Sequence, residues 1–223
     1  MPLLMRKITV RIFLIFFVLG FAYPVQSSSL TTVLQKLEET YHAIDDFEAD
    51  FDQIETNVLL NRIKKTSGTI YSLPQRKIFW HTKTPTLFKV ISDGNDIWLY
   101  YPNENQLFTE KWGKLDSNTK LALLFLRREG NLEKYFNIRW KNEKQLELEL
   151  IPKKSLSVQK IYLTLTQDKR VFLKKIIFFF PMERKTELTL KNIKFNQKLL
   201  ERHKQQPLDQ NINDKFQFIL PKK

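Results

Sequence analysis

Cysteine is absent from this chain of 223 residues, and its absence excludes two classes of exported protein. A small secreted domain held together by disulfides needs paired cysteines. A lipid-anchored bacterial lipoprotein needs a cysteine directly after its signal peptide to carry the acyl groups. The chain therefore belongs to neither class.

Histidine and glycine are scarce, and the sequence signatures of common enzymes are missing. The three histidines, His42, His81 and His203, lie far apart in the sequence, so no transition-metal site is predicted. No glycine-rich phosphate loop, H-E-x-x-H motif or G-x-S-x-G motif occurs. We expect no catalytic residue, no metal and no cofactor. A secreted hydrolase with an unrecognised nucleophile and base remains the alternative from a different functional class.

Long apolar runs are absent after the first 30 residues. Near the start, three basic residues precede or border the apolar run Ile12–Phe21, which is the pattern of a secretory signal peptide. This run is too short for a permanent membrane span. Cleavage is expected after Ser27, with Ala22 as an alternative end. The sequence thus predicts a signal peptide over 1–27 and one exported domain over 28–223.

Positive charge exceeds negative charge in the predicted exported domain. Removing the three basic residues of the signal leaves 34 Lys and Arg against 24 Asp and Glu, a net charge of +10. Behind a signal peptide, anionic membrane surfaces or acidic proteins are better partners for this charge than nucleic acid. Because the charges are dispersed along the chain, an ordinary solvated surface is the simpler interpretation.

Aromatic residues are concentrated between Gly68 and Pro102, in four consecutive stretches of strand character. Asp93-Gly94 supplies a tight-turn signal inside this block. Upstream, Phe47–Gln53 alternates apolar with acidic residues, as a half-buried strand does. Its acidic side chains are interpreted as a solvated strand face rather than as a catalytic cluster.

Helical periodicity is limited to short segments. Apolar residues recur at helical spacing over 31–43, with Thr31 or Thr32 as the N-cap. Leu121–Leu126 is predicted to form a second helix with a broad apolar side, and a helical turn is expected over Leu132–Phe136. The remaining predicted strands are 64–72, 106–110, 146–150, 161–166, 171–180, 186–195 (with a bulge near Asn192) and Phe216–Phe218. About eleven strands and two helical segments predict an antiparallel sheet wrapped around helices.

The supply of aromatic side chains is large for one domain, with 18 Phe, four Trp and seven Tyr. Ile78–Trp80 and Ile176–Phe180 are apolar on both strand faces, which a sheet with water on one side does not require. Two interpretations follow from the residues alone. Either both faces are covered in an ordinary core, or a concave inner face, covered by the Leu121–Leu126 helix, encloses a cavity for lipid.

The order of these motifs resembles the LolA family of periplasmic lipoprotein carriers. Beside the first helix and the Leu-rich helix, the resemblance rests on F-x-A-x-F-x-Q at Phe47–Gln53, the aromatic block Gly68–Pro102, L-I-P-K at Leu150–Lys153 and F-x-F-x-x-P at Phe216–Pro221. It implies a mainly β (α+β) fold: an incomplete antiparallel β-barrel of about eleven strands, with a helical lid over a hydrophobic cavity.

The resemblance also implies which residues bind lipid and what the protein does. The cavity lining or inner core would comprise Phe47, Tyr71, Ile78, Trp80, Val90 and Trp98, and the lid would contain Leu121, Leu124 and Phe125. The implied function is that of a monomeric periplasmic chaperone, which shelters lipoprotein acyl chains between an inner-membrane ABC transporter and an outer-membrane acceptor. The alternative is a LolA-like carrier or sensor of another amphiphile, such as a glycolipid.

One position departs from the family pattern. The family usually has an Arg-Pro pair after the second strand, where the arginine holds the lid shut, but Pro74 and Gln75 occupy these two positions here. Proline has no backbone donor. Arg76 lies two residues beyond Pro74 and so faces the same side of a regular strand. Arg76 is therefore either a substitute latch or a solvent-facing side chain.

Overall fold

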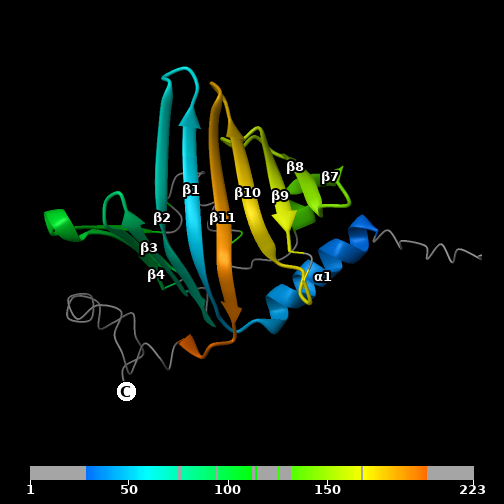
Figure 1. The fold of residues 1–223 in the computed structure, drawn as a ribbon, viewed down its shortest axis with the longest axis horizontal. Coiled ribbons are helices and arrows are strands. Elements are labelled where there is room, and N and C mark those ends of the chain that lie inside the picture. Colours follow the sequence, from blue (N-terminus) through cyan, green and yellow to red (C-terminus); the bar gives the residue numbers. More distant parts are fainter. Residues whose placement is uncertain are drawn as a thin grey trace, which may run out of the picture.

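An eleven-stranded antiparallel sheet forms the body of the protein in the computed structural model (Figure 1). The structure describes residues 29–74, 77–93, 95–111, 114, 125, 132–166 and 168–199. Within them the strand order is β6-β5-β4-β3-β2-β1-β11-β10-β9-β8-β7. The first and last strands, β1 and β11, therefore meet at the centre, and β6 and β7 form the two edges of an open sheet. The predicted mainly β fold of about eleven strands is confirmed.

The helical elements are α1 (Leu30–Ala43), η2 (Pro102–Glu104) and η4 (Leu132–Lys134). The strands are β1 (Phe47–Asn57), β2 (Arg62–Leu73), β3 (Lys77–Thr84), β4 (Phe88–Ser92), β5 (Asp96–Tyr101), β6 (Gln106–Lys111), β7 (Phe136–Asn142), β8 (Glu147–Pro152), β9 (Lys160–Leu165), β10 (Leu173–Phe180) and β11 (Arg184–Phe195).

Strand β7 was not predicted, although its sequence alternates. Phe136, Ile138 and Trp140 point to one face of the sheet, and the residues between them are polar. The expected helical turn over Leu132–Phe136 is the shorter 3-10 helix η4, which leaves Phe136 to begin the strand. The predicted strand Phe216–Phe218 lies outside the described residues.

Helix α1 begins two or three residues earlier than its predicted caps would allow. Ser29 is the N-cap, and its hydroxyl oxygen accepts a hydrogen bond from the backbone N–H of Thr32 at 3.2 Å. The prediction of Thr31 or Thr32 as the cap is therefore wrong. The three residues Ser29, Thr31 and Thr32 are all good capping types, so residue type alone does not choose among them.

The apolar side of α1 packs against one face of the sheet, which we call the inner face. Val33, Leu37 and Tyr41 are buried there, and the ring of Tyr41 meets that of Phe172 edge-on at 5.5 Å. Among the described helices, none is both long and apolar enough to cross a membrane. The strands contribute large apolar side chains to the same core. Those that are at most 2% exposed include Phe47, Phe51, Ile70, Ile78, Phe136, Leu148, Leu150, Ile161, Leu163, Ile176 and Leu188.

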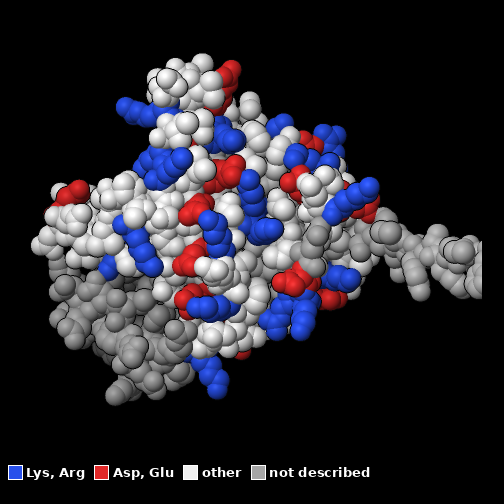
Figure 2. Space-filling model, in the orientation of Figure 1, with Lys and Arg blue, Asp and Glu red and all other residues white. Residues whose placement is uncertain are grey.

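The opposite, outer face changes character along the sheet. Over β1, β10 and β11 it carries cross-strand pairs of opposite charge, which Figure 2 shows as alternating red and blue side chains. Glu48 lies 3.5 Å from Lys194, and Lys175 lies 2.7 Å from Glu187. The interpretation of the acidic β1 residues as a charged strand face is confirmed, since such pairs stabilise neighbouring strands from the solvent side.

Over β2 to β5 the outer face carries an apolar cluster. Phe79, Ile91 and Trp98 lie opposite one another across three strands and are at most 8% exposed. Leu199, which follows β11, packs against this cluster and is completely buried. Strand β3 is apolar on both faces because Ile78 belongs to the inner core and Phe79 to this second cluster.

Asp46 fastens the segment after β11 to the start of β1. Its carboxylate accepts hydrogen bonds from the backbone N–H groups of Gln197 at 2.7 Å and Leu199 at 2.9 Å. Its backbone carbonyl accepts a third from the N–H of Asn196 at 2.9 Å. Asp46 is only 3% exposed, so its carboxylate has lost its hydrogen bonds to water. The bonds from Gln197 and Leu199 replace them.

The predicted bulge in β11 is confirmed. The register between β1 and β11 shifts between Glu48 and Asp50, whose partners are Lys194 and Lys191. Asn192 lies in the bulge with a φ of 50°, a left-handed conformation that asparagine tolerates better than most residues. Its side-chain amide donates to a carboxylate oxygen of Asp50 at 2.8 Å.

Candidate functional site

A pocket of about 440 Å³ lies on the inner face of the sheet, over strands β3 to β5. Its apolar wall is formed by Trp80 of β3, Phe88 and Val90 of β4, and Tyr101 of β5. Each of these four side chains is only partly buried, unlike the inner-face residues beneath α1. The volume lies within the range of pockets that hold small organic ligands.

The wall is built from aromatic pairs that span neighbouring strands. The rings of Phe88 and Tyr101 lie 4.6 Å apart, and Tyr101 meets Phe108 of β6 edge-on at 6.0 Å. Trp80 packs against Phe51 of β1 at 4.5 Å. Such pairs hold the apolar surface in place, so the wall is largely preformed.

A glycine in β2 lets Phe51 approach Trp80. A methyl group added at Gly68 would lie 2.9 Å from the Phe51 ring and 1.9 Å from the backbone oxygen of His81. Glycine within a strand often marks such a close approach. The indole N–H of Trp80 donates to the hydroxyl of Thr82 at 3.2 Å, so the polar atom of this wall residue has its partner.

The rim of the pocket is polar. Gln53 and Glu55 of β1 stand beside Lys64 and Thr66 of β2, and Glu104 of η2 lies across from them. The side-chain amide of Gln53 donates to Glu55 at 2.7 Å. An apolar wall with a polar rim can bury a hydrocarbon chain while a polar head group stays in water.

Two of the predicted lining residues, Trp80 and Val90, are in this pocket. Phe47 and Ile78 are on the same face but completely buried in the core. Phe125 is also buried, with its ring 6.3 Å from that of Phe136 and 6.2 Å from that of Phe178. Phe125 thus covers the inner face beside β7 and β10, away from Trp80.

The placement of Tyr71 and Trp98 on the inner side is corrected by the strand register. Tyr71 pairs with Phe79, and Trp98 pairs with Ile91, so both belong to the apolar cluster of the outer face. Successive strand residues point to opposite faces. In strands that are apolar on both faces, the composition does not reveal which side a given aromatic residue takes.

Other predicted residues are not placed. Leu121, Leu124 and Arg76 lie outside the described residues. Pro74 directly follows β2. In the described parts of the chain, no group of three or more His, Asp or Glu side chains is arranged to hold a metal ion.

Phe88 and Tyr101 are wall residues that the prediction did not single out. The signal that finds them is strand alternation: Phe88 lies two residues before Val90, and Tyr101 lies three residues after Trp98, on the other face. Knowing that Val90 faces the pocket is therefore enough to place Phe88 beside it.

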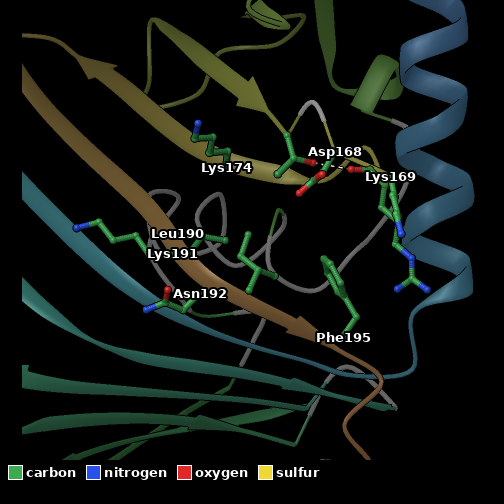
Figure 3. A pocket seen from close by; sticks show the side chains of 10 residues that line it. Asp168, Lys169, Lys174, Leu190, Lys191, Asn192 and Phe195 are labelled. Carbon is green, nitrogen blue, oxygen red and sulfur yellow. Dashed lines mark hydrogen bonds between the residues drawn. The ribbon is translucent and has the colours of Figure 1, made fainter.

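A second hollow, of about 890 Å³, lies between the start of β10 and the end of β11 (Figure 3). Its apolar part includes Leu190 and Phe195, and the Arg170 guanidinium lies 5.3 Å from the Phe195 ring centre. In Figure 3 the amino groups of Lys174 and Lys191 point away from Phe195. The cations therefore do not converge on one ligand position, and the smaller aromatic pocket is the better candidate site.

Two pKa shifts occur on the outer face of β7 to β9, away from both hollows. The carboxylate of Glu149 raises the pKa of Arg139 by a hydrogen bond and by its charge. A hydrogen bond with Tyr162 raises the pKa of Lys160. Arg139 is exposed and Lys160 is only partly buried, so these contacts belong to the charged surface rather than to a catalytic centre.

The fold and the pocket define a class: an open antiparallel sheet with a ligand-sized apolar hollow on its inner face. Residues 42–203 match the family model described as outer membrane lipoprotein carrier protein LolA. This match covers most of the chain, and the chain therefore belongs to the LolA family. The description is that of a carrier family, not of an enzyme family.

Relatives at the sequence level carry the same description. The chain is 27% identical over 136 residues to an outer-membrane lipoprotein carrier protein of Serratia proteamaculans, covering 61% of this chain and 64% of the relative. It is 26% identical over 101 residues to one of Shewanella oneidensis, covering 45% and 49%. The chain thus spans about half to two thirds of the length of these curated relatives.

Solved structures were also found that are similar to this chain at low sequence identity. An uncharacterized conserved protein from Thermus thermophilus is 12% identical, with a TM-score of 0.51 over 80% of this chain and 94% of the other. A LolA superfamily protein from Nitrosomonas europaea is 13% identical, with a TM-score of 0.40 over 74% and 92%. At this identity the Thermus structure supports the sheet architecture alone.

Proposed function

We propose that this protein carries lipoproteins by sheltering their acyl chains against the Trp80, Phe88, Val90 and Tyr101 wall. The observation that supports the proposal is a partly exposed aromatic surface with a polar rim, on the inner face of a LolA-family sheet. The hydrocarbon would lie against the rings, and the polypeptide of the cargo would leave past the rim. No catalysis is required.

Energetics explain why such a carrier needs partners. A diacyl anchor of about 30 methylene groups gains roughly 24 kcal/mol from burial, at about 0.8 kcal/mol per methylene. That exceeds the practical limit of non-covalent affinity, about 18–21 kcal/mol. A carrier therefore does not extract the anchor by affinity alone. We infer an energy-driven step, for which an inner-membrane ABC transporter would load the carrier and a tighter outer-membrane acceptor would unload it.

The proposed place of action is the periplasm. The signal-peptide pattern over 1–27 supports export, and the family description is that of an outer membrane lipoprotein carrier. A pocket that leaves its wall partly exposed suits a carrier that must release its cargo. Because Pro74 replaces the usual arginine, release would not depend on the family's usual latch at that position.

The direct test is a transfer assay. The exported protein is added to inner-membrane vesicles that bear the lipoprotein-releasing transporter and a labelled lipoprotein, with ATP, and the label in the soluble fraction is measured. The proposal predicts release as a one-to-one complex with this protein. No ATP-dependent release above the level without the protein would contradict it.

A second candidate function is a carrier or sensor of another amphiphile, such as a glycolipid. It is favoured by the hollow between β10 and β11, which is lined by basic and apolar side chains. The lipoprotein-carrier function uses only the aromatic pocket and gives this hollow no role. Native mass spectrometry of the protein purified from the periplasm separates the two functions. A bound glycolipid, together with failure of the transfer assay, would support this second function.

A further inference from the structure

Two neighbouring turns at one end of the sheet expose large apolar side chains. Val58, Leu59, Leu60 and Ile63 belong to the β1–β2 hairpin and are 57%, 65%, 65% and 64% exposed, and Met182 of the β10–β11 turn is 72% exposed. We call these five residues the apolar tip. They are the five most exposed large apolar residues of the described chain. Clustered exposure of this kind marks an interaction surface, whereas single exposed apolar residues do not.

The turn geometry does not require these side chains. Asn57 accepts a hydrogen bond from the backbone N–H of Leu60 at 3.1 Å, and Asn61 takes the left-handed position with a φ of 44°. The two asparagines therefore form the turn, and the positions between them are usually polar in proteins. Three aliphatic residues in sequence at a solvent-exposed turn have no role in the packing of this fold.

The two turns form one surface. The backbone N–H of Val58 donates to the carbonyl of Glu183 at 3.3 Å, and Asn57 pairs with Arg184 at the ends of β1 and β11. In Figure 1 both turns lie at the end of the sheet away from α1. The apolar tip thus lies on two hairpins that are paired with each other, and both turns are at the same end of the sheet.

Positive charge surrounds the apolar tip. Residues 57–65 and 181–185 contain five cations, Arg62, Lys64, Lys65, Arg184 and Lys185, and a single acid, Glu183. Figure 2 shows this end of the molecule as mostly uncoloured side chains, with a red patch at one edge and blue side chains beside and below them. Apolar side chains at an extremity with a basic collar complement an interface between hydrocarbon and anionic head groups.

We propose that the apolar tip docks the protein on an anionic lipid surface. The leucines would enter the head-group region, and the collar would contact the lipid phosphates. Docking would also turn the polar rim of the aromatic pocket toward the membrane, because Lys64 belongs to both the collar and the rim. The proposal goes beyond the carrier function and does not depend on it, since it concerns membrane association alone.

Vesicle flotation tests the proposal. The exported protein is mixed with vesicles of phosphatidylcholine containing about one third phosphatidylglycerol, and with vesicles of phosphatidylcholine alone. We expect binding to the anionic vesicles that weakens as salt is raised, because the charge contribution is screened. Leu59→Ser together with Leu60→Ser should weaken this binding by about tenfold or more, since two apolar side chains lose their burial.

The charge contribution has its own variant. Lys64→Gln together with Lys65→Gln should weaken binding to anionic vesicles by about 25-fold, at about fivefold per cation near such a surface. Matched controls are Leu107→Ser, at an exposed residue of the edge strand β6, and Lys36→Gln with Lys174→Gln, at exposed residues of α1 and of the start of β10, at the opposite end of the sheet. The controls should bind as the original protein does.

Two results would overturn the proposal. One is the absence of binding to anionic vesicles at low salt. The other is an equal loss of vesicle binding in the leucine variant and in its control variant. If vesicles are not bound but the leucine variant blocks transfer from transporter-containing membranes, the surface binds a protein instead. Thermal unfolding of each variant shows that it is folded. The affinity of the aromatic pocket for lipid is measured separately, so that a loss of membrane docking is distinguished from a loss of the carrier function.

Discussion

The two halves of the inner face carry the same kind of side chain but bury them to different extents. On β8 and β9, Leu148, Leu150 and Ile161 are completely buried in a core that includes α1. On β3 to β5, Trp80 and Val90 keep part of their surface exposed and line the pocket. We call these the closed half and the open half.

The comparison shows that strand composition does not decide between core and binding surface. In both halves the strands place apolar side chains on the inner face at alternate positions. The strand pattern alone therefore does not show which half is covered by another element. What differs is the element that covers them: Val33, Leu37 and Tyr41 of α1 fill the closed half. The open half retains a hollow that a ligand can occupy. The following changes test whether the two halves are separable.

The largest expected effect is in the open half. Gly68→Ala should cost about 4 kcal/mol or more of unfolding free energy, because its methyl would lie 1.9 Å from a backbone oxygen of the neighbouring strand. Urea unfolding measures the loss. Lys65→Ala, an exposed residue of the same strand, is the control and should change little. Full stability of Gly68→Ala would show that β2 and β3 are not held together as described.

The next effect belongs to the closed half. Phe172→Ala should cost about 3–5 kcal/mol, because the ring is 1% exposed and lies 5.2 Å from Phe47 and 4.9 Å from Phe195. Ligand affinity of the remaining folded protein should be unchanged. A fall in affinity as large as the fall in stability would indicate that the two halves act as one.

A smaller effect is expected where the two halves meet. Asp46→Ala should cost about 1–3 kcal/mol, since one buried and one part-buried backbone N–H group lose their acceptor. Hydrogen exchange should become faster at the amides of Gln197 and Leu199. Unchanged exchange at both amides would show that other contacts hold this segment.

The smallest effect is expected on the outer face of β1 and β11. Lys191→Ala should cost less than about 1 kcal/mol, because Lys191 and its partner Asp52 are 55% and 47% exposed. Neither half of the inner face should respond. A loss of ligand affinity in this variant, measured by titration, would mean that the outer face influences the pocket.

Much of this fold follows from the sequence because alternation is strong. The strand over Phe47–Gln53 and the bulge near Asn192 could be read from the positions of apolar residues. Strand β7 was missed although Phe136, Ile138 and Trp140 alternate clearly, because a helical turn was expected to include its first residue. The cap of α1 was misplaced by two or three residues, since several capping residue types are adjacent.

The candidate site was only partly predictable. Trp80 and Val90 line the pocket of the inner face, and their role in lipid binding stays a prediction, whereas Tyr71 and Trp98 lie on the outer face. Where both faces of a strand are apolar, the sequence does not show which residues point to the inner face. Only the register of the strands relative to β1 shows this. The extent of the open half also depends on which strands α1 covers, which no local pattern specifies.

The most direct test compares two tryptophans of the inner face. Trp80 lies in the open half and Trp140 in the closed half, and both are partly buried. Each is replaced by alanine, and affinity for a diacylated lipopeptide is measured beside urea unfolding. Both variants should lose about 2 kcal/mol of stability, about half the cost of a fully buried ring. Trp80→Ala should in addition lose about tenfold or more in affinity, while Trp140→Ala keeps its affinity. Equal affinities of the two variants would contradict the assignment of the acyl-chain site to the open half.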